Sequence, residues 1–309
     1  MDEAVVQDSI RYLSSDDARR SIDANPYWPK WNSPWWHMLA LHEMGLAEKI
    51  PAATAQHMIG ALKKQYPQDG TQVAITPCPC EIGNIFQVLS ATGANLDQEL
   101  PWIRSWLFSQ QMPDGGLNCD EDAYRAQPPA SSIVGTIAPL EALLLYTRRP
   151  FTSEEERFLD AGAACLIGRK LRLGCSAPHN AEEHLDEEDW LKPCFPRFYL
   201  YDVLRGLSFI LRWAEKRRKP IPAKAIREVI DALERKFRDG RVRIERKAFD
   251  GIGSRVMNAA GEWGRSPAAS FFPILLQVSE VGQESPYLTS QWAEVRERIK
   301  SLTLEGLIA

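Results

Sequence analysis

The chain has 309 residues, of which 44% are hydrophobic and 25% are charged, and its formal net charge is −4. This is the usage of a folded globular protein and excludes a disordered chain. The charge balance offers no basic patch of the kind that binds nucleic acid. The N-terminal segment lacks the basic and apolar regions of a secretory signal, and no window of about 20 apolar residues predicts a membrane span. We therefore expect a cytoplasmic protein with no nucleic-acid partner and no transmembrane segment.

The length lies above the usual limit of about 250–300 residues for one hydrophobic core. It therefore predicts either two domains or one closed array of repeats. The sequence favours repeats, because one unit recurs along it: an apolar helix, a short polar link and a second, amphipathic helix. We expect a single domain over residues 1–309.

The predicted elements in chain order are an N-terminal helix followed by five helical hairpins. The helix spans about residues 3–15, and the hairpins span roughly residues 33–67, 80–112, 131–170, 197–238 and 268–302. No stretch shows sustained alternation of apolar and polar residues, so no sheet is expected.

Several helix ends carry clear signals. Gly45, Gly93 and Gly282 each follow an apolar residue by four positions, as expected for a glycine that ends a helix in the left-handed conformation. Thr152 and Glu155 have the spacing of a capping box, which predicts a helix that begins at residue 153.

Two long connections interrupt the pattern, at residues 171–196 and 241–266. The first includes an acidic run and the second is rich in glycine. Loops of this length are often lids or rims of functional sites. The alternative is that both are plain solvated loops.

The segment Gln111–Leu117 reads QMPDGGL and resembles the Gln-x-x-Asp-Gly-x-Trp repeat of squalene cyclases, with Leu117 in place of the tryptophan. Residues 114–145 and 196–207 are similar to a bacterial branch of the prenyltransferase and squalene-cyclase repeat superfamily. The resemblance implies an all-α fold, an α/α toroid whose first helices form an inner ring and whose second helices form an outer ring. It also implies an enzyme acting on a hydrophobic, isoprenoid-like ligand in the central cavity. The alternatives are a non-catalytic toroid that binds a ligand or peptide, and a scaffold without an active site.

If the hairpins stack around an axis, the loops that enter the first helices meet at one end of the barrel. These loops bring cysteines, carboxylates and aromatic residues together, a mixture typical of a ligand site. The cysteines and carboxylates are Cys78, Cys80, Cys119, Cys194, Asp120 and Asp122. The expected substrate pocket consists of Trp35, Trp36, His37, Cys80, Arg197, Tyr199 and Phe271. The alternative is that the aromatic residues only pack a filled centre.

The resemblance also suggests a metal site, because protein prenyltransferases hold zinc with Asp, Cys and His. The candidate ligands here are Asp114, Cys119 and His184. Asp120 could replace the first of these, and His37 or His179 the last. Cys78 and Cys80 could add two further thiolates. Six cysteines in a chain of this length are no disulfide scaffold, and buried, inert thiols are the alternative to a bound metal.

Two other chemistries are open. Class II cyclases protonate an alkene with an Asp-x-Asp-Asp motif, and Asp120-Glu121-Asp122 offers Asp-x-Asp. Crowded carboxylates can hold one member protonated as an acid, so we assign Asp120 and Asp122 as candidate catalytic acids; an acidic turn in solvent explains the run equally well. The other chemistry is nucleophilic, with Cys119 or Cys80 activated by His37.

Overall fold

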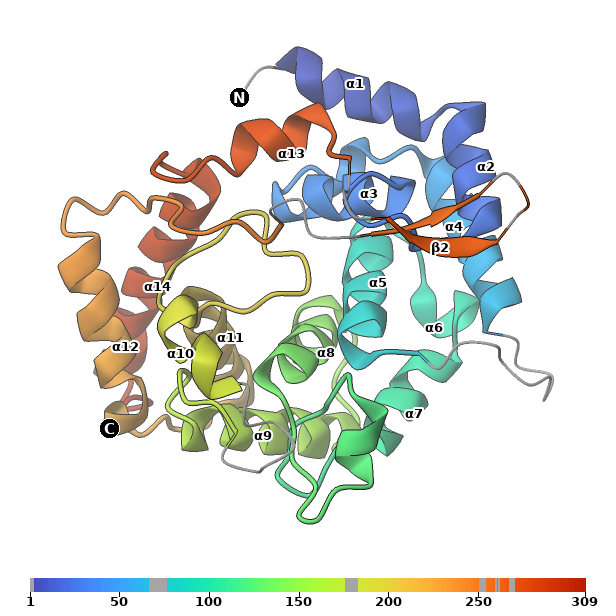
Figure 1. Ribbon diagram of the computed structural model, residues 1–309. Coiled ribbons are helices and arrows are strands. Elements are labelled where there is room, and N and C mark those ends of the chain that lie inside the picture. The colour runs from blue at the N-terminus through green and yellow to red at the C-terminus, as the bar shows by residue number, and fades with distance from the viewer. Residues whose placement is uncertain are drawn as a thin grey trace. The chain divides into compact units, whose positions relative to one another are not determined.

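The computed structural model describes residues 3–66, 77–175, 183–249, 254–258, 260, 262–266 and 270–309. Over these residues the protein is mostly helical, with fourteen α-helices, two 3-10 helices and one pair of short strands (Figure 1). This confirms the predicted all-α class.

The chain divides into two compact units. Unit 1 comprises Met1–Thr76, Val88–Trp102 and Lys247–Glu280, and unit 2 comprises Pro77–Gln87, Ile103–Arg246 and Val281–Ala309.

Unit 1 is built from short helices around one buried helix. Its elements are α1 (Glu3–Leu13), α2 (Asp16–Ala24), α3 (Pro34–Glu43), η1 (Ala47–Lys49), α4 (Ala52–Gln65), α6 (Leu96–Glu99), β1 (Ser254–Met257), β2 (Trp263–Ser266) and α13 (Pro273–Val278). Helices α1, α2 and α3 pack on one another, α2 also contacts α4, and α13 lies beside α1 (Figure 1). The first eight residues of α3 are all buried, as expected of a helix that is apolar on every face.

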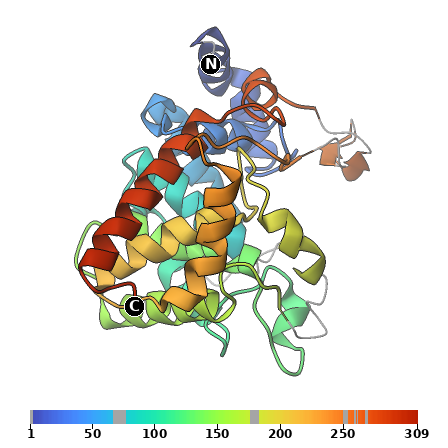
Figure 2. The ribbon, with the colours of Figure 1, turned by 90° about the vertical axis from the view of Figure 1, so that its left-hand side faces the viewer.

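Unit 2 is organised around α11. Its elements are η2 (Glu121–Tyr124), α8 (Ile133–Tyr146), α9 (Ser153–Gly168), α10 (Glu183–Trp190), α11 (Val203–Arg217), α12 (Ala223–Lys236) and α14 (Pro286–Leu304), together with most of α5 (Pro79–Ala91) and α7 (Trp102–Ser109). Helix α11 packs against α8, α9, α12 and α14, and Figure 2 shows the long α14 running beside it. Both α8 and α11 are buried along most of their length, so they form the core of this unit.

Each predicted hairpin has its first and second helix in the structure, and several predicted ends are confirmed. Gly45 and Gly93 have φ values of +71° and +94° and end α3 and α5 through bonds to the His42 and Ser90 carbonyls. The prediction is wrong for Gly282: its φ is +90°, but α13 ends at Val278 and the Gly282 N–H donates to the Ile244 carbonyl. The capping box of α9 is present, with both of its hydrogen bonds between Thr152 and Glu155. The toroidal closure of the hairpins stays a prediction.

Helices α2 and α10 and strands β1 and β2 were not predicted. Helix α2 follows α1 directly, and α10 lies in the acidic run that was expected to be a loop. The expectation of no sheet is wrong for β1 and β2, which pair antiparallel with Arg255 opposite Arg265. Strands of four residues are too short to show the alternation on which a prediction depends.

No helix in the described ranges is both long enough and apolar enough to cross a membrane.

Candidate metal centre

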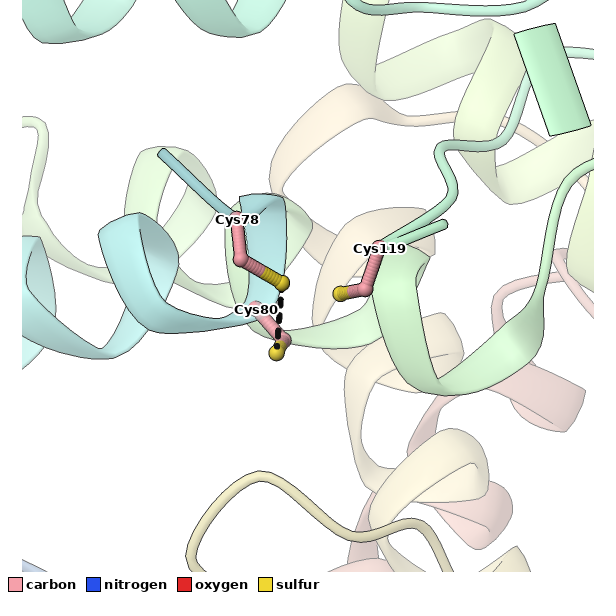
Figure 3. A group of neighbouring side chains, drawn as sticks. All are labelled: Cys78, Cys80 and Cys119. Atoms are coloured by element: carbon pink, nitrogen blue, oxygen red, sulfur yellow. Dashed lines mark hydrogen bonds between the residues drawn. The ribbon is translucent and has the colours of Figure 1, made fainter. Parts of the chain in front are cut away.

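Three cysteine side chains meet in unit 2. The Sγ atoms of Cys78, Cys80 and Cys119 all lie within 4.8 Å of one another (Figure 3). The Sγ atoms of Cys78 and Cys80 are 3.4 Å apart. All three residues are partly exposed. No other group of three or more His, Cys, Asp or Glu side chains in the described ranges brings its ligand atoms this close.

The start of α5 positions two of the sulfurs. The carbonyl of Cys78 accepts the backbone N–H of Ile82 at 3.0 Å, which makes Cys78 the residue that caps this helix. Pro79 follows at the first helical position, where a missing N–H costs nothing and its fixed φ suits the helix. Cys80 is the next residue. Both sulfurs therefore lie at a helix N-terminus, where unpaired N–H groups favour negative charge.

The third sulfur comes from a loop that is anchored at the neighbouring residue. The side-chain amide of Asn118 donates to the Ala130 carbonyl at 2.9 Å, and its oxygen accepts the backbone N–H of Asp120 at 2.9 Å. The Tyr124 hydroxyl also bonds the backbone of Asn118. These bonds hold both sides of Cys119, whose side chain points toward Cys78 and Cys80 in Figure 3.

Helix α8 is the platform for both segments, and two glycines allow the approach. A Cβ atom on Gly83 of α5 would clash with the α8 backbone at Ala138 and Pro139. A Cβ atom on Gly135 of α8 would lie 2.9 Å from the Leu117 carbonyl oxygen and 3.1 Å from the Cys119 nitrogen. Because both contacts are backbone to backbone, they fix the spacing of the three sulfurs more tightly than side-chain packing would.

The sulfurs share one negative charge. Hydrogen bonds from the thiols of Cys119 and Cys80, with further help from the backbone N–H groups of Glu81 and Cys80, lower the pKa of Cys78 to about 4. The pKa of Cys80 is raised well above its usual value, first because its thiol bonds to Cys119 and Cys78 and then because it is buried. The pKa of Cys119 is also raised, chiefly by its bond to Cys78. The metal-free group is therefore one thiolate held by two thiols.

This arrangement suits a thiophilic metal ion. A Zn–S bond is about 2.3 Å long, so two sulfurs at the corners of a tetrahedron around zinc are about 3.8 Å apart. The Cys78 and Cys80 sulfurs are 3.4 Å apart and all three sulfurs lie within 4.8 Å of one another, so small side-chain movements suffice to reach that spacing. No fourth ligand joins the three sulfurs among the side chains that the structure describes. Three protein ligands leave one coordination position for water or a ligand atom, as in catalytic zinc sites.

Of the candidate set Asp114, Cys119 and His184, the described side chains place only Cys119 in this group, where it meets the two further thiolates that the sequence offered, Cys78 and Cys80. The Asp114 carboxylate accepts hydrogen bonds from the backbone and hydroxyl of Ser131 at 3.0 and 2.9 Å, and pairs with Arg169 at 3.1 Å. The side chain of His184 lies outside the described residues, as does all of His179.

The candidate acids lie beside the group but face solvent. The Asp120 carboxylate accepts the backbone N–H of Asp122 at 2.9 Å and so caps the 3-10 helix η2. The Asp122 side chain is 73% exposed and pairs with Arg125 at 3.1 Å. These are the contacts of an acidic turn in solvent, which was the alternative to a pair of catalytic acids.

Of the predicted pocket residues of unit 2, Cys80 belongs to the sulfur group, whereas Arg197 and Tyr199 lie in the loop before α11. Arg197 is buried and makes a two-point ion pair with Asp202, at 2.6 and 3.0 Å, while Tyr199 is partly exposed. Cys194 is fully buried and does not join the sulfur group.

The remaining pocket residues belong to an aromatic cluster in unit 1. Trp35, Trp36 and His37 are buried in α3, and Phe271 packs on Phe249. His37 was the predicted activator of a cysteine, but its Nδ1 lies 3.0 Å from Ser9 Oγ and its ring stacks on Phe272. The predicted pocket draws on both units and stays a prediction.

The sequence signalled the cysteines of the centre but not its exact set. Cys-Pro-Cys before an apolar helix was noted as a source of two thiolates, and Cys119 was assigned as a ligand. The expected meeting of the loops that enter the first helices joined these three cysteines, and the structure brings their sulfurs together. That expectation also included Cys194, which is wrong, and it gave no role to Gly83 and Gly135.

No protein-family model matches the chain, and comparisons with curated proteins and with solved structures find no match either.

Proposed function

We propose that the protein binds one zinc ion through Cys78, Cys80 and Cys119 and that this centre is its functional site. The observation that carries the proposal is the approach of the three Sγ atoms to within 4.8 Å. Thiolates select soft or borderline ions such as zinc over magnesium or calcium. All three cysteine residues are partly exposed, which leaves the ion a path of entry.

The zinc would serve chemistry rather than only hold the fold together. Structural zinc sites are closed by four protein ligands, whereas catalytic sites keep one position for water or substrate. Three described ligands on a partly exposed face correspond to the second kind. A zinc ion held by the three sulfurs would act as a Lewis acid, which polarises a bound oxygen or lowers the pKa of a bound water.

For the reaction class we propose an enzyme related to terpenoid cyclases and prenyltransferases, which acts in the cytoplasm on a hydrophobic, isoprenoid-like ligand inside an α/α toroid. Its support is the resemblance of Gln111–Leu117 to the cyclase repeat and the succession of helical hairpins. The motif has a defined structural role here: the Gln111 side chain donates to the carbonyls of Gly115 and Phe158, at 2.8 and 2.9 Å. It therefore ties the turn to α9, as a repeated hairpin motif should.

The zinc proposal is tested by metal analysis of the full chain, purified with a reductant. We expect about one zinc per chain, and loss of that zinc in Cys119→Ser. The matched control is Cys165→Ser, because Cys165 is a buried cysteine of the same unit that lies outside the sulfur group. Cobalt substitution should give a thiolate-to-metal charge-transfer band that weakens in Cys119→Ser but not in Cys165→Ser. A folded chain with no metal, or zinc retained by Cys119→Ser, would refute the proposal.

Turnover then separates the enzyme from its alternatives. Conversion of an isoprenoid diphosphate by the zinc-loaded chain, absent from Cys119→Ser, supports the enzyme. Zinc binding with a co-purified lipid and no turnover supports a ligand-binding protein instead.

A further inference from the structure

We propose that hydrogen peroxide joins Cys78 and Cys119 in a disulfide and expels the zinc, so that the centre responds to oxidants. The zinc half of this inference rests on the proposed function, whereas the disulfide half rests only on the sulfur geometry. The two cysteines come from different segments of unit 2 and are partly exposed, and their sulfurs lie within 4.8 Å of each other.

The geometry favours Cys119 over Cys80 as the partner of Cys78. A bond between Cys78 and Cys80 would close a ring across Pro79, whose φ is fixed, within the first turn of α5. The bond to Cys119 instead closes a loop of roughly 40 residues, which removes far more freedom from the unfolded chain and stabilises the folded one accordingly. Cys119 lies between two elements rather than inside a helix, so rotation of its side chain can bring the sulfurs to the bonded distance of about 2.05 Å.

The reaction needs only peroxide as the oxidant. The Cys78 thiolate attacks one peroxide oxygen; an S–O bond forms, the O–O bond breaks and hydroxide leaves, which gives a sulfenic acid. Cys119 then attacks the Cys78 sulfur as the thiolate, which is either released from zinc or formed when its thiol gives a proton to the first hydroxide; the S–S bond forms, the S–O bond breaks and a second hydroxide leaves. Two thiolates are oxidised and one peroxide is reduced, and protons from the thiol or from solvent convert both hydroxides to water.

Zinc is lost because a disulfide sulfur is no longer a thiolate, and the thiolate is the ligand. After the reaction only Cys80 of the three ligands retains a thiolate, and a single protein ligand does not hold zinc against water. The remaining cysteines, Cys165, Cys175 and Cys194, are buried and lie outside the group, so they do not compete for the oxidant.

The experiment is a peroxide titration of the zinc-loaded full chain, read by a colorimetric zinc chelator and by tryptic peptide mapping. Trypsin cuts after Arg104, so Cys78 and Cys80 fall in one peptide and Cys119 in the next. We expect stoichiometric zinc release, with the two peptides linked through Cys78 and Cys119, and recovery of zinc binding after a phosphine reductant. Cys165→Ser should behave as the wild type. The link should form in metal-free Cys80→Ser and be absent from metal-free Cys119→Ser.

The outcomes separate this inference from the proposed function. A chain that binds zinc but keeps it under peroxide, or loses it with the oxidation confined to the peptide of Cys78 and Cys80, overturns the inference and leaves the zinc centre standing. A chain that binds no zinc yet forms the link between Cys78 and Cys119 overturns the proposed function and supports the disulfide.

Discussion

The stability of the protein should depend on pH through one buried histidine of unit 1. His37 is 4% exposed, and its Nε2 has no hydrogen-bond partner among the described residues. Its ring lies against Phe272, with centroids 3.7 Å apart. Burial lowers the pKa of His37 to about 3, against an ordinary value of 6.5. The folded chain therefore excludes a proton that the unfolded chain accepts.

The linkage between proton binding and folding sets the direction and the size of this pH effect on the free energy of unfolding. A histidine whose pKa is lowered by folding contributes its full stability above pH 6.5, and that stability is lost as the pH falls toward 3. The loss is about 1.4 kcal/mol per pH unit inside this window. Between pH 7.5 and 5.5, the free energy of unfolding should therefore fall by about 1.4 kcal/mol through His37 alone.

Urea denaturation followed by tryptophan fluorescence at the two pH values measures this loss. His37→Phe keeps an aromatic ring on Phe272 but cannot be protonated, so its pH-dependent loss should be smaller than that of the wild type by about 1.4 kcal/mol. His57→Gln is the control, because His57 is partly exposed and paired with Asp23; it should keep the dependence that His37 causes. Equal losses in the wild type and His37→Phe would refute the reasoning.

Two further substitutions, with Gly168→Ala as a control, test the core of unit 2 by urea denaturation. Asp202→Asn breaks the fully buried ion pair with Arg197 and should cost about 3–5 kcal/mol, because it leaves a buried charge without its partner; an unchanged midpoint would contradict this. Gly206→Ala places a Cβ atom into the hydroxyl of Tyr201 and should cost about 1–3 kcal/mol through overpacking. Gly168→Ala meets nothing within 4 Å and should change the stability by less than about 1 kcal/mol; equal effects of the two alanines would refute the predicted clash.

The helices that the sequence predicted are those with local signals. Apolar spacing, terminal glycines and the capping box at Thr152 act within a few residues, so they can be recognised in isolation. Helix α10 has no such signal, because its sequence, EHLDEEDW, is strongly acidic. Its first residue is fixed by distant partners: the Glu183 carboxylate accepts the backbone N–H of Ile133 at 2.8 Å and pairs with Arg169 at 3.2 Å. A helix held by tertiary contacts of this kind cannot be predicted from its own residues.

The three-sulfur centre was predicted in part, because the expected meeting of loops included Cys78, Cys80 and Cys119 but also Cys194, which lies outside the group. The sequence places Cys78 and Cys80 together, since a Cys-Pro-Cys segment before an apolar helix puts both at its N-terminus. Their meeting with Cys119 depends on two close approaches to α8, at Gly83 and Gly135, where any larger residue would push one segment away. A glycine inside a helix destabilises that helix relative to alanine. From the sequence alone, such a glycine does not show which backbone it allows to approach. The chemistry of the centre was therefore present in the sequence as residue types, but its assembly depends on helix contacts between segments distant in the chain.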